Sequence, residues 1–315
     1  EPFEKGVINQ ALLIIRINDE MVDYKYFKYL FRLVLSKAIT TGGGDSTIPN
    51  FPSMDVIKDI DVNLPNIQIQ RRIGAVLDCL EKRIDQNETV NDNLQQIAKT
   101  IYDYWFTQFD FPNEDGKPYR SSGGQMVWNE QLKREIPVGW SSASIVINPL
   151  STVMKPGVDV FDRKEYLATA EVNGTSISTG SVVEYATRES RANMQPTVNS
   201  VWFAKMKNSV KHLYLNTEMQ PLIDSTILST GFCGIQCTEL SFEFIASFVE
   251  SSYFETIKDI LAHGATQEAV NNEDMEAIRF AVPTDNILMK YHETTRGMYA
   301  QISKNICENR KLTAL

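Results

Sequence analysis

The residues best suited to chemistry lie between Ser190 and Thr217, a stretch that carries positive charge and no acidic residue. The whole chain has 40 acidic and 31 basic residues and a net charge of −9, so this stretch is unusual. Lysine and arginine neutralise DNA phosphates, and arginine and amide side chains address base edges. We therefore expect a DNA-contact surface there, with a solvated basic edge as the alternative. The candidate residues are Arg191, Asn193, Gln195, Lys205, Lys207, Asn208 and Lys211.

Two glycine-led segments, "GGGDSTIPN" at 42–50 and "HGATQEAVN" at 263–271, occupy equivalent places in an internal repeat. Glycine lets backbone approach a phosphate, and neighbouring side chains can donate hydrogen bonds to it. The candidate donors are Ser46, Thr47, Thr266 and Gln267. A third set, diluted by adjacent acids, is Arg163 and Lys164 in "FDRKEYLAT". The alternative for the glycine segments is a plain turn that binds nothing.

Motifs for catalysis are missing from the sequence. It has neither the Asn/Asp-Pro-Pro-aromatic loop and glycine turn of an amino-methyltransferase nor a phosphate-binding GxxxxGK[ST] loop. His212, His263 and His292 are too scattered for a metal site, and the four cysteines form no zinc pattern, which favours free thiols. The sequence therefore predicts a protein that is not an enzyme and has no cofactor or metal.

No apolar run approaches the ~20 residues of a membrane span, and the opening "EPFEKGVINQ" lacks the features of a signal peptide. We expect a cytoplasmic protein without a membrane partner.

The candidate DNA-contact residues lie in segments that precede two predicted long helices. Apolar residues alternate at spacings of four and three from Ile73 to Trp105, which is the heptad pattern of a rod of ~60 Å that packs on another helix. The same positions, shifted by 218, recur from Tyr291 to Leu312. The spacing predicts two helices that pair.

Each helix carries two asparagines in its apolar seam: Asn87 and Asn91 in the first, Asn305 and Asn309 in the second. A buried amide needs a partner, and specifying register is its best-attested use in coiled coils. If the helices run antiparallel, Asn87 faces Asn309 and Asn91 faces Asn305. The alternative places all four at a solvated edge.

The segments before the helices also repeat. "YKYFKYLFRLVL" matches "FEFIASFVESSYFETI" as an aromatic-rich helix, and each long helix follows a short β-like run and a proline, Pro65 or Pro283. "GVINQALLIIRI" matches "GFCGIQCTELSF" as a glycine-led strand. Residues 137–230 have no counterpart ahead of Gly6, so we expect a first domain that lacks its N-terminal part.

The expected fold is α+β: two mixed α/β domains in tandem, each followed by a long helix, with the helices forming an antiparallel coiled-coil pair. The expected boundaries are a partial first domain at 1–64, a helix at 65–107, a connector at 108–136, a second domain at 137–283 and a helix at 284–315.

The order of these elements, Gln70 near the start of the first helix, the closing "IYDYWFTQFDFP" and the following "IPVGW" resemble the DNA-specificity subunit of Type I restriction-modification systems. "SRANMQPTVNSVWFAKMKNSVKHLYL", "ILSTGF" and "HGATQEAVN" resemble one subgroup of its target recognition domains. The resemblance covers nearly the whole chain, except for the missing front of the first domain.

The resemblance implies a non-catalytic subunit that reads a bipartite double-stranded DNA target. Its helices would set the gap and dock two methyltransferase subunits, and restriction/translocase subunits would join the full complex. A different class also fits: a truncated scaffold that binds protein partners through the helices without reading DNA. A fusion that contains a methyltransferase is a distant third.

Overall fold

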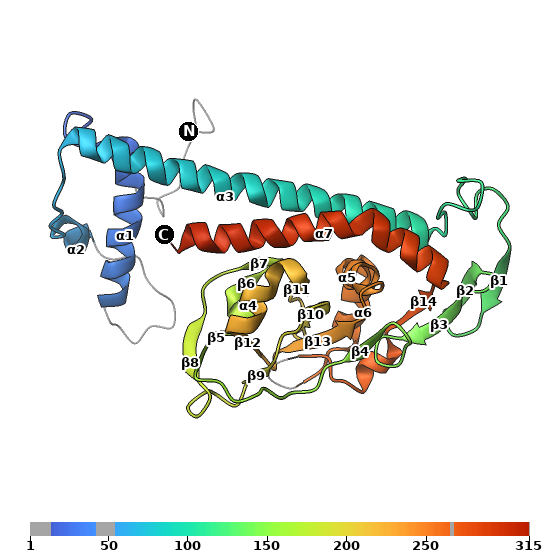
Figure 1. Cartoon of the computed structure of the whole chain (residues 1–315). Coiled ribbons are helices and arrows are strands. Elements are labelled where there is room, and N and C mark those ends of the chain that lie inside the picture. The colour runs from blue at the N-terminus through green and yellow to red at the C-terminus, as the bar shows by residue number, and fades with distance from the viewer. Residues whose placement is uncertain (1–13, 42–53, 265–267, 315) are drawn as a thin grey trace. The chain divides into compact units, whose positions relative to one another are not determined.

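The protein, seen in a computed structural model, is described over residues 14–41, 54–264 and 268–314. It combines helices with several small sheets, which confirms the α+β class (Figure 1). The chain divides into two compact units, residues 1–85 and 86–315. The boundary falls within a long helix, so each unit is described by itself.

The long helices predicted by the heptad spacing are present as α3 and α7 (Figure 1). The α-helices are α1 (Tyr24–Thr41), α2 (Met54–Lys58), α3 (Ile67–Tyr102), α4 (Gln220–Ser225), α5 (Phe242–Glu250), α6 (Ser252–Leu261) and α7 (Asp285–Thr313). Shorter helical turns are the π-helical η1 (Asp103–Thr107) and the 3-10 turns η2 (Thr169–Glu171), η3 (Thr217–Met219) and η4 (Asp274–Ala277).

In the first unit, α1 packs on the N-terminal part of α3. Gln70 is buried and ties this junction together: its Oε1 accepts from the amide of Asp23 at 3.0 Å, and its Nε2 donates to the carbonyls of Met21 and Pro65 at 3.0 and 2.8 Å. A Cβ at Gly74 would lie 2.7 Å from the backbone nitrogen of Tyr26. Only glycine therefore lets the two helices meet this closely.

Ion pairs fasten the rest of α1. Lys25 Nζ lies 2.8 Å from Asp78 Oδ2, while Lys28, Tyr29 and Arg32 all donate to Glu81. The hydrogen bonds from Lys28 and Tyr29 lower the pKa of Glu81 to about 2.

The second unit is built on two four-stranded sheets, ordered β11-β10-β13-β4 and β8-β5-β12-β9, with two-stranded pairs β1-β2, β14-β3 and β6-β7. Pairing is antiparallel except between β12 and β5. The strands are β1 (Met126–Asn129), β2 (Arg134–Pro137), β3 (Ser141–Ser144), β4 (Ser151–Val153), β5 (Arg163–Leu167), β6 (Val172–Asn173), β7 (Ser176–Ile177), β8 (Ser181–Glu184), β9 (Ala192–Met194), β10 (Ser200–Ala204), β11 (His212–Leu215), β12 (Thr226–Ser229), β13 (Phe232–Cys237) and β14 (Arg279–Val282).

Helix α5 lies between α7 and strands β10 and β11 and is the centre of the main core. Its residues from Phe242 to Val249 are all buried. Ser247 Oγ is 2.7 Å from the Tyr291 hydroxyl and 2.8 Å from that of Tyr299, so polar groups inside this interface have partners. Trp105, at the end of the first heptad seam, packs edge-on against Tyr291 in the same core.

The seam asparagines of the two repeats meet within this unit. Asn87 Nδ2 donates to Asn309 Oδ1 at 2.8 Å, and Asn305 Nδ2 donates to Asn91 Oδ1 at 2.8 Å. Asn87, Asn91 and Asn305 are buried. Rising numbers on α3 face falling numbers on α7, so the segments that carry these pairs run antiparallel, as Figure 1 also shows.

One local prediction in the first unit is wrong: the segment before Pro65 contains the short helix α2 and irregular backbone instead of a β-run. Most of the predicted strand "GVINQALLIIRI" lies outside the described residues, and its described end, residues 14–17, forms no strand. The matching segment before Pro283 does form a strand, β14, because β3 pairs with it. A short segment with the composition of a strand forms a strand only when another strand pairs with it.

Candidate nucleic-acid interface

The predicted basic stretch becomes β9, the hairpin β10–β11 and the loop at 205–211 that joins those two strands. Strand β10 is completely buried, so its ends are fixed by the core. The loop carries Lys205, Lys207 and Lys211 and no acid. Asn208, at the turn of the loop, adopts a left-handed φ of 56°, a conformation that asparagine tolerates better than most residues.

Three basic residues of the stretch converge on the turn between β12 and β13. The Arg191 carbonyl accepts from the amide of Thr230 at 2.8 Å, and the Lys205 amide donates to Gly231 at 3.0 Å. Lys211 Nζ donates to the carbonyl of Thr169, whose side chain lies beside Gly231. We call Arg191, Lys205 and Lys211 the Gly231 cluster.

The ends of these side chains differ in availability. Arg191 is exposed, and within the described residues neither its guanidinium nor the Lys205 ammonium has a hydrogen-bond or carboxylate partner. Lys211 retains two of its three donors beyond its bond to Thr169. Lys207 is instead paired with Glu268 at 2.9 Å. Arg191 and Lys205 are thus the best placed to meet an anion.

Two of the three predicted amide readers, Gln195 and Asn193, have side-chain hydrogen-bond partners. Gln195 Oε1 accepts from Lys164 Nζ at 3.1 Å, and its Nε2 donates to the carbonyl of Pro196 at 3.1 Å. Asn193 Oδ1 lies 3.5 Å from an Arg188 nitrogen. Bidentate pairing with adenine needs both the oxygen and the nitrogen of an amide, so Gln195 would have to exchange partners to read a base.

Arg163 does not join the Gly231 cluster. It opens β5, which runs parallel to β12, whereas Arg191 adjoins the last residue of β12 through the pairing of Ala192 with Ser229. The two arginines therefore lie toward opposite ends of this sheet. Four other predicted residues lie outside the described residues: Ser46, Thr47, Thr266 and Gln267. Ala269, which is described, pairs with Met206 of the basic loop.

Sequence reasoning missed an aromatic and cationic group beside Asn193. Arg188 lies over the Tyr185 ring at 4.0 Å and donates to the carbonyls of Tyr185 and Ala192. Tyr185 meets Phe161 edge-on at 5.7 Å. The spacing of Tyr185 and Arg188 was a usable signal, but Glu189 excluded both from the acid-free stretch.

The cysteines near the cluster are inert. All four cysteines are free, and burial raises the pKa of the Cys233 thiol to about 12 against the opposing charge of Lys205. Burial also raises the pKa of Cys237. Both thiols stay protonated at neutral pH, so neither is a nucleophile.

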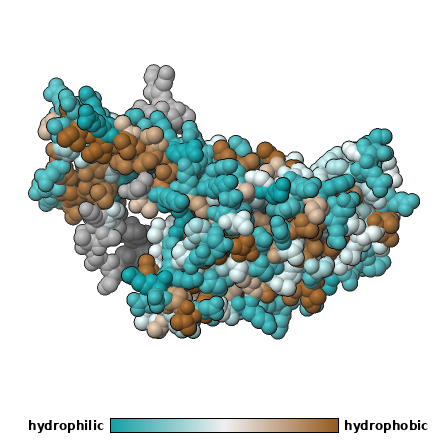
Figure 2. Space-filling view, in the orientation of Figure 1, coloured by the Kyte–Doolittle hydropathy of each residue, from teal (hydrophilic) through white to brown (hydrophobic). Residues whose placement is uncertain are grey.

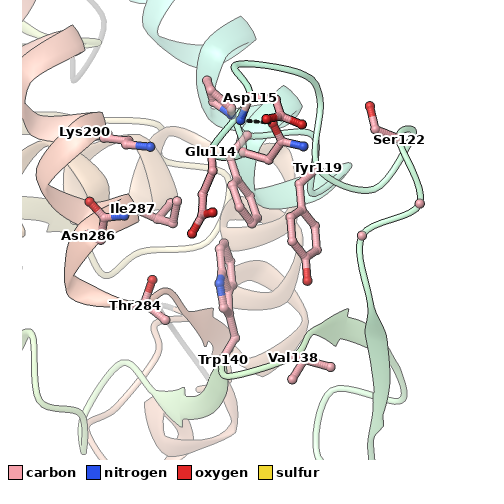
Figure 3. Close-up of a pocket in the computed structure, with 15 residues that line it drawn as sticks. Glu114, Asp115, Tyr119, Ser122, Val138, Trp140, Thr284, Asn286, Ile287 and Lys290 are labelled. Atoms are coloured by element: carbon pink, nitrogen blue, oxygen red, sulfur yellow. Dashed lines mark hydrogen bonds between the residues drawn. The ribbon is translucent and has the colours of Figure 1, made fainter.

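A second candidate surface lies where the connector meets α7. A hollow of about 470 Å³ is lined by Phe111, Tyr119, Trp140, Ile287 and Lys290, among others (Figure 3). The Phe111 ring stacks on Tyr119 at 4.7 Å and on Trp140 at 5.2 Å. Figure 3 shows Glu114 projecting toward Trp140 from the connector. Aromatic walls with charged rims suit a protein contact.

The described residues contain cationic side chains suited to binding an anion. No group of His, Cys, Asp and Glu side chains within them could hold a metal ion, and no helix there is long and apolar enough to span a membrane. Exposed cations around a glycine turn can bind an anion through charge and hydrogen bonds. Arg191, Lys205 and Lys211 bring such cations to the turn at Gly231.

The chain is similar in sequence to two curated proteins. The Type I restriction enzyme MjaIX specificity subunit of Methanocaldococcus jannaschii is 24% identical over 319 residues, which cover 94% of this chain and 67% of that protein. The HindI specificity subunit of Haemophilus influenzae is 25% identical over 112 residues, 35% of this chain and 21% of that protein. No family model matches the chain.

Two solved structures are also similar. The Type I restriction-modification S subunit from M. genitalium has a TM-score of 0.46 at 13% identity, and the HsdS subunit from Thermoanaerobacter tengcongensis has 0.36 at 12%. Each comparison covers 95% of this chain and 71% of the other. Both curated relatives that the chain resembles in sequence are named as specificity subunits of Type I restriction enzymes.

Proposed function

We propose that the chain is the non-catalytic DNA-specificity subunit of a cytoplasmic Type I restriction-modification enzyme. It reads one half of a bipartite double-stranded target with its second unit and docks methyltransferase subunits along α3 and α7. The homology over 94% of the chain carries the proposal. Restriction/translocase subunits join the same complex, and the chain itself binds no cofactor.

The Gly231 cluster is the proposed DNA-facing surface. Arg191 and Lys205 present unpaired cations on either side of one turn, which supports contact with consecutive phosphates or a guanine edge. The acidic remainder of the chain, with its net charge of −9, would repel DNA elsewhere and so favour this one orientation.

The proposed role of the asparagine pairs is to fix the register of α3 against α7. Each buried amide meets an amide of the other helix, so a slip by one heptad would place asparagine against apolar residues. A fixed register would hold the two recognition domains at a fixed spacing, and that spacing would set the gap in the DNA target.

The experiment measures affinity for a fluorescent duplex of random sequence against salt concentration. Lys205→Ala should lower the log–log salt slope by about 0.9, the effect of one lost phosphate contact. Arg191→Ala should weaken binding as well and, on the cognate duplex, cost about 1–3 kcal/mol of discrimination at one base pair. Lys304→Ala is the control, because this lysine lies on α7 and is paired with Glu218. Wild-type slopes and selectivity in both cluster variants would contradict the assignment.

Two observations favour the scaffold alternative. Both polar atoms of the Gln195 amide are engaged, and the aromatic hollow beside α7 would suit a protein partner. A sizing column with purified modification subunit and duplex DNA separates the two functions. A complex of the two proteins that retains no DNA would support the scaffold, and co-elution of all three would support the specificity subunit.

A further inference from the structure

The C-terminal half of α6 carries a lysine that the DNA-contact residues do not explain. Lys258 has 0% of its side chain exposed, although lysine is rarely buried without a partner. Its Nζ lies 2.6 Å from Glu255 Oε2 and 3.7 Å from Asp259 Oδ1. The same ammonium donates to the carbonyl of Ser209 at 3.0 Å. The buried ammonium of Lys258 on α6 is therefore hydrogen-bonded to the backbone of the basic loop.

Asp259 makes a second hydrogen bond to the loop, one residue before Ser209. Its Oδ1 accepts from the amide of Asn208 at 3.1 Å, at the position with the left-handed φ of 56°. The first half of the loop is held differently: the backbones of Lys205 and Lys207 bond to Val270 and Glu268. The first half of the loop is thus held by backbone bonds to Glu268 and Val270, and the second half is held by side chains of α6.

The same network of hydrogen bonds and ion pairs extends from α6 to strand β11 in the core. Glu255 also bonds His212 Nε2 at 2.9 Å, and Glu250 lies 3.7 Å from His212 Nδ1 and accepts from Tyr214. Burial disfavours a charged imidazole, but these two carboxylates outweigh it and raise the pKa of His212. Burying so many charges costs free energy that apolar residues would not, so stability alone gives no reason for this arrangement.

We propose that Lys258 and Asp259 are positioning residues that hold the loop at 205–211 in its DNA-binding shape. The inference rests on the proposed function of the Gly231 cluster and loop. An ordered loop loses less conformational entropy on binding than a loose one, so preorganisation raises affinity without adding a contact. Lys258 is completely buried and cannot touch DNA itself, which makes its effect separable from a phosphate contact.

The test compares Lys258→Met and Asp259→Ala with Lys304→Met, which also removes a paired cation but lies on α7. Asp259 is partly exposed, so its variant keeps the fold if Lys258→Met does not. The first readout is amide hydrogen exchange of residues 205–211, which should speed up about tenfold in the two α6 variants while β10 stays protected. The control should match the wild type.

The second readout is affinity for a random-sequence duplex across salt concentrations. The α6 variants should bind about 3- to 10-fold more weakly at every salt concentration, with an unchanged slope, because the phosphate contacts stay the same and only their ordering cost rises. Unchanged loop exchange, unchanged affinity or a reduced slope would overturn the proposal. Lys205→Ala separates the two ideas: if it leaves the slope unchanged, the DNA-contact assignment fails, while loop exchange still decides the role of α6.

Discussion

The two units use the same sequence pattern with different outcomes. In the second unit, the aromatic-rich helix α5 is buried along its length and β14 pairs with β3. In the first unit, the matching helix α1 leaves Tyr24 71% and Leu33 54% exposed, and residues 59–65 form no strand. An amphipathic pattern is enough to form a helix, but how far its apolar face is buried depends on the elements that pack against it.

The forces that hold the two helices differ accordingly. Helix α1 relies on ion pairs to α3, whereas α5 relies on aromatic packing and buried hydroxyls. One side of α1 borders an apolar hollow of about 350 Å³ lined by Phe27, Leu30 and Phe31, and apolar surface gathers over this region in Figure 2. Surface ion pairs contribute little, so the first unit should be the less stable one.

The largest contrast should come from large-to-small substitutions on the two helices. Phe244→Ala in α5 removes a side chain with no exposure and should cost about 3–5 kcal/mol. Leu33→Ala in α1 should change stability by about 0.5 kcal/mol or less. All four tryptophans lie beyond residue 85, so tryptophan fluorescence during denaturation reports the second unit and amide exchange reports α1. Equal effects would show that α1 is as well packed as α5.

The asparagine pairs test whether both repeats contribute to one seam. Asn305→Leu leaves the buried Asn91 oxygen without its donor and should cost about 1–3 kcal/mol. The double change with Asn91→Leu should recover most of that loss but permit a second register or oligomer, visible by native mass spectrometry. A double variant that is recovered in stability and keeps one mass would rule out a register role for this pair.

Glycines inside the long helices offer a matched pair of substitutions. Gly74→Ala places a Cβ against the Tyr26 backbone and should weaken α1 docking by about 1–3 kcal/mol. Gly297→Ala on α7 meets nothing within 4 Å and should stabilise its helix by up to about 1 kcal/mol. Loss of α1 exchange protection in Gly74→Ala alone is the expected result. Undisturbed protection would mean that α1 does not dock through Gly74.

The smallest effect should be a pH dependence confined to the first unit. The pKa of Glu81 is about 2 when α1 is docked, below the ~4.3 of a free glutamate. Its stabilising contribution is therefore present above pH ~4.3 and lost as the pH falls toward 2. Exchange protection factors of α1 should decline over that window, and Glu81→Gln should remove the decline. In the second unit, burial raises the pKa of Glu243, so this buried acid cannot produce the same loss.

Local pattern predicted the elements whose causes are local. The four-and-three spacing from Ile73 to Trp105 is a property of one helix, and it correctly predicted α3 and, by repetition, α7. The asparagine contacts also followed from arithmetic, because an antiparallel register assigns Asn87 to Asn309 once the repeat length is known.

The remaining features depend on neighbours that are distant in sequence. Gln195 looked like a base reader, but Lys164, 31 residues earlier, occupies its oxygen. Lys258 in "ETIKDIL" has the pattern of an ordinary solvent-facing lysine, yet the hairpin covers it completely. The segment before Pro65 has the composition of a strand, but within the described residues no strand pairs with it as β3 pairs with β14. Such features need tertiary contacts to be predicted.

The most direct test of the central claim is to map DNA methylation in a host without its own modification, carrying the modification subunit with and without this chain. We expect a bipartite methylated sequence to appear only when the chain is present. With Arg191→Ala, one position in one half of that sequence should become degenerate while the gap length stays constant. The same methylated sites with and without the chain would contradict the account, because sequence specificity would then reside elsewhere.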